Sequence, residues 1–132
     1  MFCVKSVDVE TIEKINILNS SLLAMKLCIE EVLDKIKTQS PVVLVDGNRK
    51  VKDIKIPQKN IIKGDSKSAS IAAASILAKV ERDEFMKKIS IKYPNYHWEK
   101  NKGYLSKEHI EAIKKYGITK YHRKSFLKNI LN

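Results

Sequence analysis

The sequence predicts an α/β fold, because short apolar runs of strand length alternate with longer segments of helical periodicity. The run 42–45, Val-Val-Leu-Val, is wholly apolar and mostly β-branched, which is typical of a parallel strand buried on both faces. The pair Ile61–Ile62 leads into Lys63-Gly64-Asp65 and predicts a second short strand that ends in a carboxylate. Segments of helical character precede and follow these runs, as expected for helices that cover a sheet.

Three helices are expected. Apolar residues recur at spacings of three and four over 12–36, after the capping-type residue Asp8. A second helix is predicted over 66–89, and the many Ala and Ser residues of its first half indicate close packing against the sheet. The last helix is expected over 106–117, where Gly117 is a suitable residue to end it.

Two strands are too few for this architecture, since a stable sheet needs about three or more strands and a covered face. We therefore expect partner strands beside 42–45 that the sequence does not supply. We interpret 1–132 as one partial domain, with an α/β core portion at 1–84 and a basic helical region at 85–132.

Composition narrows the class of protein. The chain has 132 residues, with 26 Lys and Arg against 15 Asp and Glu, and a net charge of +11. Residues 63–132 hold sixteen of the basic side chains and seven of the acidic ones, which indicates a polyanionic partner such as nucleic acid. The alternative is a lysine-rich surface that only serves solubility.

The apolar runs, the N-terminal residues and the cysteines indicate where the protein is located. No apolar run approaches the roughly 20 residues that a membrane span needs, and the N-terminal residues lack the apolar core of a secretory signal. Cys3 and Cys28 lie outside any C-x-x-C spacing. We expect a cytoplasmic protein with free thiols and no membrane partner.

Asp46 and Asp65 are the candidate chemical groups. Each follows a short apolar run and would fall at the carboxyl edge of a parallel sheet, where open α/β folds place their sites. Two carboxylates that meet there suit Mg²⁺ or Mn²⁺. The alternatives are local, since Asp46-Gly47-Asn48 has turn chemistry and Asp65 is a suitable helix N-cap. Phosphate-loop, zinc-ligand and serine-nucleophile spacings fail, which leaves metal-assisted phosphodiester chemistry as the supported enzymatic interpretation.

These and other residues together resemble the bacterial ribonuclease HII family in order and spacing. The matching segments extend over nearly the whole chain: Ile15 to Leu18, Leu22 to Met25, Val43 to Asn48, Lys63 to Asp65, Ile71 to Val80, Arg82-Asp83, Lys102 to Tyr104, and His122-Arg123 with Ser125-Phe126.

The resemblance implies a truncated ribonuclease H-like fold with a C-terminal helical region. It also implies an endonuclease that degrades the RNA strand of RNA–DNA hybrids by two-metal hydrolysis with Mn²⁺ or Mg²⁺, including single ribonucleotides embedded in duplex DNA. Asp46 and Asp65 match two of the four metal-binding carboxylates of the family, whereas the family's adjacent Asp-Glu pair matches nothing in this chain. We therefore expect a missing N-terminal segment, and a catalytically impaired, basic hybrid-binding module is the alternative function.

The resemblance also implies substrate-binding residues. Tyr104 matches the family tyrosine that packs on the sugar at the RNA–DNA junction, with an ordinary core tyrosine as the alternative. Lys102, Lys79 and Arg123 are expected to bind backbone phosphates. His122 has two interpretations, a phosphate contact and a buried, hydrogen-bonded histidine.

Overall fold

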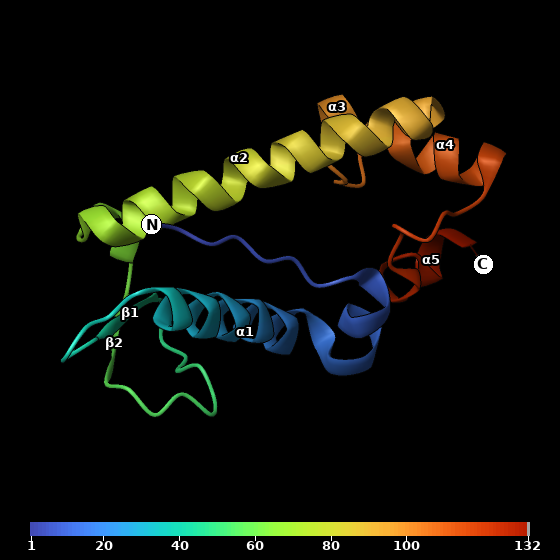
Figure 1. Cartoon of the computed structure of the whole chain (residues 1–132). Helices are drawn as coiled ribbons and strands as arrows, with labels where there is room; N and C mark the ends of the chain where they lie inside the picture. Colours follow the sequence, from blue (N-terminus) through green and yellow to red (C-terminus); the bar gives the residue numbers. More distant parts are fainter. Residues whose placement is uncertain (132) are drawn as a thin grey trace. The chain divides into compact units, whose positions relative to one another are not determined.

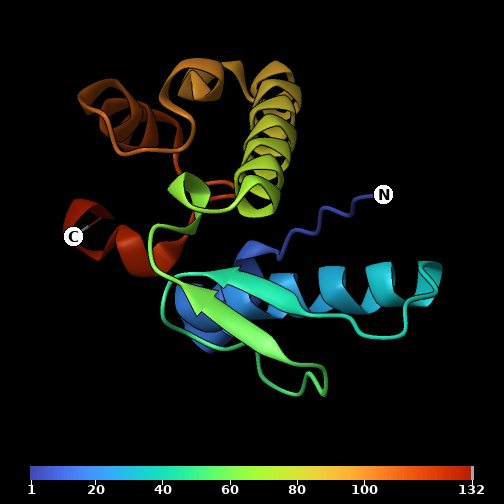
Figure 2. The same ribbon diagram turned by 90° about the vertical axis from the view of Figure 1, so that its left-hand side faces the viewer.

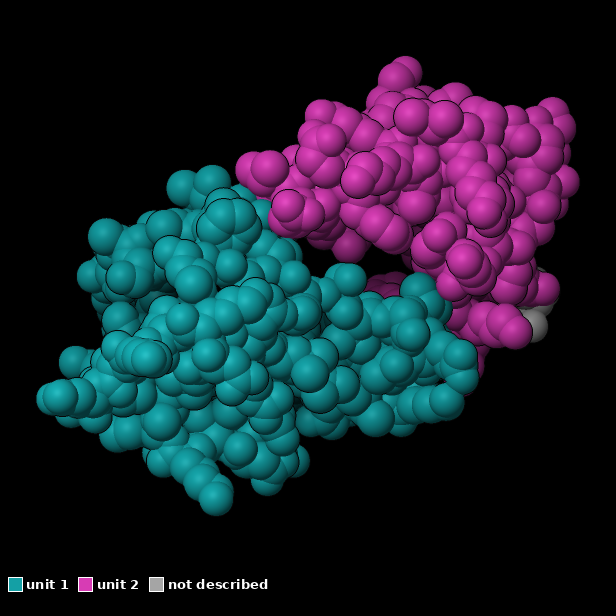
Figure 3. Space-filling view, in the orientation of Figure 1, with its two compact units in different colours: residues 1–78 teal, residues 79–132 magenta. Residues whose placement is uncertain are grey.

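The fold contains five α-helices, two β-strands and three short 3₁₀ helices within residues 1–131, which this computed structural model describes (Figure 1). The chain divides into two compact units, which we call unit 1 (from Met1 to Ala78) and unit 2 (from Lys79 onward) (Figure 3). None of the described helices is both long enough and apolar enough to cross a bilayer.

Helix α1 (Val9–Lys35) begins where the sequence predicts. The Asp8 carboxylate accepts a hydrogen bond of 2.8 Å from the backbone N–H of Thr11 and so caps the helix. The helix is interrupted at Asn16, whose backbone has φ 67° and ψ 168° and whose side chain accepts from the Asn19 N–H at 3.0 Å. Asn16 therefore acts as a second N-cap inside a segment whose apolar periodicity predicts one continuous helical region.

The sheet consists of strands β1 (Val43–Asp46) and β2 (Gln58–Ile61), which pair in parallel (Figure 2). The first strand is confirmed, whereas the second begins before the predicted Ile61–Ile62 pair. Its polar residues adopt strand conformation because their backbones pair with β1 and their side chains hydrogen-bond to the connecting loop. Gln58 exchanges two hydrogen bonds with the backbone of Val51, and Asn60 donates to the Arg49 carbonyl.

Strand β1 is covered on one face only within the described residues. Val45 is 5% exposed, while Leu44 is 39% exposed and the preceding Val42 is 58% exposed. Side chains of α1, including Ile29 and Val32, share an apolar hollow with β1 and the residues before it. Within the described residues, the prediction of a strand buried on both faces is thus wrong, because the side chains on the second face are exposed.

Helix α2 (Ala69–Lys92) follows the 3₁₀ helix η1 (Gly64–Ser66). It begins three residues later than predicted, because residues 64–66 form a separate tight turn. Ile71 is buried in its first turn, whereas Ala73 and Ala74 are exposed. The expected close packing of the small residues against the sheet is therefore wrong for the described chain.

Unit 2 is helical. Helix α4 (Lys107–Tyr116) matches the prediction, with Ser106 as its N-cap and Gly117 at φ 80° as its C-cap. The remaining elements are short: η2 (Pro94–Tyr96), α3 (Trp98–Asn101), η3 (Lys124–Phe126) and α5 (Lys128–Leu131).

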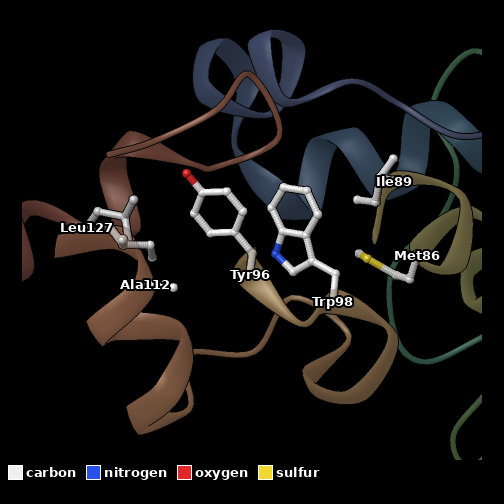
Figure 4. Packing of buried hydrophobic residues seen from close by; sticks show 7 residues of the cluster. Met86, Ile89, Tyr96, Trp98, Ala112 and Leu127 are labelled. Carbon is white, nitrogen blue, oxygen red and sulfur yellow. The ribbon is translucent and has the colours of Figure 1, made fainter. Parts of the chain in front are cut away.

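An aromatic and aliphatic core holds these short elements together (Figure 4). Tyr96 stacks on Trp98 with ring centroids 5.1 Å apart, and its hydroxyl donates to the Gly117 carbonyl at 2.9 Å. Burying a large apolar side chain contributes roughly 1.5–3 kcal/mol. The core comprises Met86, Ile89, Tyr96, Trp98, Ala112, Ile113 and Leu127.

Candidate metal centre and nucleic-acid interface

Asp46 is the last residue of β1, and its side chain is exposed. Its Oδ1 accepts a hydrogen bond of 2.8 Å from the backbone N–H of Gly64, eighteen residues further along the chain. The Gly47 N–H donates to the Ile61 carbonyl at 3.0 Å, which continues the strand pairing past Asp46. The carboxylate of Asp46 is thereby held against the residue that immediately precedes Asp65.

Gly64 makes this approach possible. A β-carbon at this position would lie 2.6 Å from Ile71 Cδ1 and 3.2 Å from Asp46 Oδ1. Any side chain would therefore displace the buried Ile71 and crowd the carboxylate. Sequence reasoning did not single out Gly64 as a site residue, although a glycine directly before a candidate metal ligand is a signal that could have found it.

Asp65 lies in η1, is exposed, and accepts the Ser66 N–H at 3.0 Å. The alternative in which Asp65 caps the following helix is wrong for this structure, because α2 begins at Ala69 and the Ile71 N–H lies 3.4 Å from the Ser68 hydroxyl. Asp65 therefore contributes a carboxylate to the turn beside Asp46.

Two carboxylates at one edge of a parallel sheet fit an open metal site, in which waters and substrate supply the remaining ligands. No group of three or more His, Cys, Asp or Glu side chains within residues 1–131 could enclose a metal ion. Mg²⁺ is commonly bound through one or two carboxylates together with waters and substrate phosphates. The donor set of Asp46 and Asp65 fits an open site of that type and does not fit an all-protein cage.

Tyr104 lies on the loop between α3 and α4, and its side chain is 78% exposed, so the core-tyrosine alternative is wrong. Its backbone is nevertheless held on both sides. The Tyr104 N–H donates to the Asn101 carbonyl at 2.9 Å, and the Tyr104 carbonyl lies 2.8 Å from His109 Nδ1. The structure thus presents an aromatic ring to solvent from a residue whose backbone is hydrogen-bonded at both its N–H and its carbonyl.

The loop before Tyr104 is shaped by residues of α2. Lys102 has φ 53°, and its carbonyl accepts from the Arg82 guanidinium at 3.2 Å. Its ammonium group lies 3.9 Å from the Asp83 carboxylate. Gly103 has φ 86°, and a β-carbon there would lie 3.3 Å from Met86. Lys102 and Tyr104 therefore share one well-supported loop.

The other predicted phosphate-binding residues are also in unit 2. Lys79 is exposed on α2. The Arg123 guanidinium carbon lies 3.7 Å from the centroid of the Phe126 ring, which orients the cation through its planar face. From residue 79 onward the chain carries fourteen Lys and Arg against six Asp and Glu, so unit 2 has a strongly positive field.

His122 is buried, which favours the second of its two interpretations. Its Nε2 lies 3.2 Å from Nε2 of the buried His109, which sequence reasoning did not single out. Burial and the neighbouring His109 lower the pKa of His122 to about 4. His122 is therefore a neutral, buried side chain and not a phosphate contact.

Comparison with known proteins agrees with the sequence motifs. A model of the ribonuclease HII family matches residues 2–129. Ribonuclease HII of Christiangramia forsetii is 57% identical over 123 residues, which cover 93% of this chain and 60% of that protein. Ribonuclease HII of Caldicellulosiruptor saccharolyticus is 54% identical over 130 residues, 98% of this chain and 61% of that protein.

These relatives are ribonucleases, and the helices and small parallel sheet are compatible with a ribonuclease H-like fold. The chain belongs to the ribonuclease HII family. It spans about three fifths of the length of these two relatives.

Proposed function

We propose that this protein acts as a ribonuclease H-type endonuclease on the RNA strand of RNA–DNA hybrids, including single ribonucleotides embedded in duplex DNA. Membership of the ribonuclease HII family supports the reaction class. The observation that carries the proposal is the placement of the Asp46 carboxylate on the Gly64 N–H, at the sheet edge beside Asp65. Both cysteines are free thiols, in keeping with a cytoplasmic location.

Asp46 and Asp65 would hold the divalent cations, Mn²⁺ or Mg²⁺. Bound there, the cations would activate a water and stabilise the leaving oxygen of the phosphodiester. The bond from Gly64 engages Asp46 Oδ1 and orients the whole carboxylate. The exposure of both side chains leaves room for a substrate phosphate to complete the coordination.

Unit 2 would bind the substrate. The ring of Tyr104 is exposed. Its apolar face is suited to packing on a ribose, and its hydroxyl is suited to the polar surroundings of the ribose 2′-hydroxyl. Lys102, Lys79 and Arg123 would bind backbone phosphates, which orients the duplex without reading its sequence. Discrimination would then come from the A-form-like shape and the 2′-hydroxyl.

A second candidate function is binding of hybrids without cleavage. It is favoured by the finding that no cluster of three or more metal-binding side chains occurs in the described part of the chain. The positive charge of unit 2 would serve hybrid binding in either case.

Cleavage and binding of one labelled duplex separate the two functions. The duplex carries a single ribonucleotide, and the purified chain is assayed with Mn²⁺ and with Mg²⁺ at several concentrations. Asp46→Asn and Asp65→Asn should abolish cleavage and leave binding in EDTA nearly unchanged, because they remove ligands and not phosphate contacts. Asp53→Asn is the matched control, since Asp53 is exposed and pairs with Lys26 at 3.6 Å.

The results of these assays distinguish cleavage from binding without cleavage. Metal-dependent cleavage that tolerates Asp65→Asn would overturn the site. Binding of the hybrid without cleavage under every metal condition would overturn the endonuclease activity of this chain and support the binding function. Absence of both activities would overturn both proposals.

A further inference from the structure

We infer that His109 and His122 are positioning residues that hold Tyr104 through a directional chain of hydrogen bonds between two neutral imidazoles. The inference about substrate discrimination rests on the proposed function of Tyr104, whereas the hydrogen-bond chain itself does not. All the residues involved lie in unit 2.

The direction of the chain is set first at His122. The backbone N–H of Thr119 donates to His122 Nδ1 at 2.9 Å. A backbone N–H can only donate, so His122 Nδ1 must be an unprotonated acceptor. A neutral His122 then carries its hydrogen on Nε2, the atom that lies 3.2 Å from His109 Nε2.

A second group that can only donate sets the direction at His109. The indole N–H of Trp98 points to His109 Nε2 at 3.2 Å. Because both Trp98 and His122 present hydrogens to this nitrogen, His109 Nε2 is the acceptor and its hydrogen resides on Nδ1. That Nδ1–H donates to the Tyr104 carbonyl at 2.8 Å. The chain thus runs from Thr119 through His122 and His109 to Tyr104.

The surroundings keep this arrangement intact. His109 is 2% exposed and His122 is 7% exposed. The ring of Tyr96 lies 5.0 Å from that of His122, and the ring of Trp98 lies 5.2 Å from it. An added proton on His122 Nδ1 would face the Thr119 N–H, so protonation opposes the native contacts.

The consequence concerns the loop that carries Tyr104. The exposed Tyr104 ring is held through its backbone, at the N–H by Asn101 and at the carbonyl by His109 and the Ser106 N–H. The histidine is the side-chain member of these contacts, and it ties the loop to the interior of unit 2. Loss of its donor would remove the tie between the Tyr104 carbonyl and the interior of unit 2, while the backbone bonds of the loop and the core rings stay in place.

Two amide variants at one position separate the two ends of His109. His109→Asn places an amide N–H near the former Nδ1 and keeps a donor for the Tyr104 carbonyl. His109→Gln places an amide oxygen near the former Nε2 and keeps an acceptor for Trp98 and His122, while it loses the bond to Tyr104. Both variants remove one aromatic ring, so each serves as the stability control for the other.

The binding readout is the ratio of affinities for a duplex with one embedded ribonucleotide and for the all-DNA duplex of the same sequence, both measured in EDTA. Tyr104→Ala should lower this ratio about fivefold, as expected for loss of roughly 1 kcal/mol of ring contact. His109→Gln should lower the ratio similarly, and His109→Asn should keep most of it. Equal ratios in the two His109 variants would overturn the positioning role.

The unmodified chain provides an independent test. Two-dimensional ¹⁵N–¹H spectra of the imidazoles at pH 7 should show the hydrogen on Nδ1 of His109 and on Nε2 of His122. The opposite tautomers, or a charged imidazole at either position, would overturn the chain. If the tautomers are as inferred but Tyr104→Ala leaves the affinity ratio unchanged, the proposed sugar contact fails and the hydrogen-bond chain stands.

Discussion

Acidification from pH 7 to pH 5 should destabilise unit 2 through His122. The pKa of this histidine falls from 6.5 to about 4 on folding, because of burial and the adjacent His109. The unfolded chain therefore binds more protons between these values, so the stability present above pH 6.5 is lost as the pH falls towards 4. His122 also contacts the side chains of Tyr96, Trp98 and Thr119. None of them carries a negative charge that would stabilise a protonated His122.

The magnitude follows from proton linkage. A pKa difference of this size corresponds to about 3 kcal/mol once the pH is below both values, and to about 2 kcal/mol at pH 5. The exposed carboxylates with lowered pKa, such as Glu31 at about 2, lose their contribution only in more acidic solution. Between pH 5 and pH 7 the change in the free energy of unfolding should therefore report on His122 and not on these carboxylates.

Urea unfolding followed by tryptophan fluorescence measures the effect, since Trp98 is the one tryptophan of the chain and lies against both histidines. His122→Asn should lose most of the pH dependence, because its amide oxygen still accepts from Thr119 but does not titrate. His97→Asn is the control, since His97 is exposed. A loss below about 0.5 kcal/mol in the unaltered chain, or an equal loss in His122→Asn, would refute the reasoning.

Three further predictions concern packing, capping and charge. Gly64→Ala should lower the free energy of unfolding by about 1–3 kcal/mol, because the new methyl group would crowd Ile71 Cδ1. Adding Ile71→Val removes that atom and should recover part of the lost stability. If the effects of the two substitutions are strictly additive in urea unfolding, this explanation is wrong. Ser106→Ala should cost about 1 kcal/mol through loss of the α4 N-cap, and an unchanged thermal midpoint would count against it. Affinity for RNA–DNA hybrids should fall steeply with salt and vary little with sequence, so salt-independent titrations would exclude phosphate contacts as the main source of binding.

Local signals in the sequence were sufficient for helix ends. Asp8 before α1, and Ser106 and Gly117 around α4, lie where the sequence predicts because capping uses side chains and backbone groups within three or four residues. Asn16 shows the limit of apolar periodicity, which continues through the residue although the side chain there starts a new helix.

Strand limits and burial needed the tertiary structure. The polar residues Gln58 and Asn60 join β2 only because β1 and the connecting loop supply partners for them. The exposure of Leu44 and of the small residues of α2 depends on which elements cover each face, and strand composition alone does not carry that information.

The order of the motifs along the chain was enough to predict the family, and the strand-like runs before Asp46 and Asp65 marked these carboxylates as candidate metal ligands. The bond from the Gly64 N–H to Asp46, and the contacts of His109 with His122 and with the Tyr104 carbonyl, become visible only in the folded chain. The physical reason is sequence separation: a capping or periodic pattern reports neighbours along the chain, whereas these bonds join residues brought together by strand pairing and core packing.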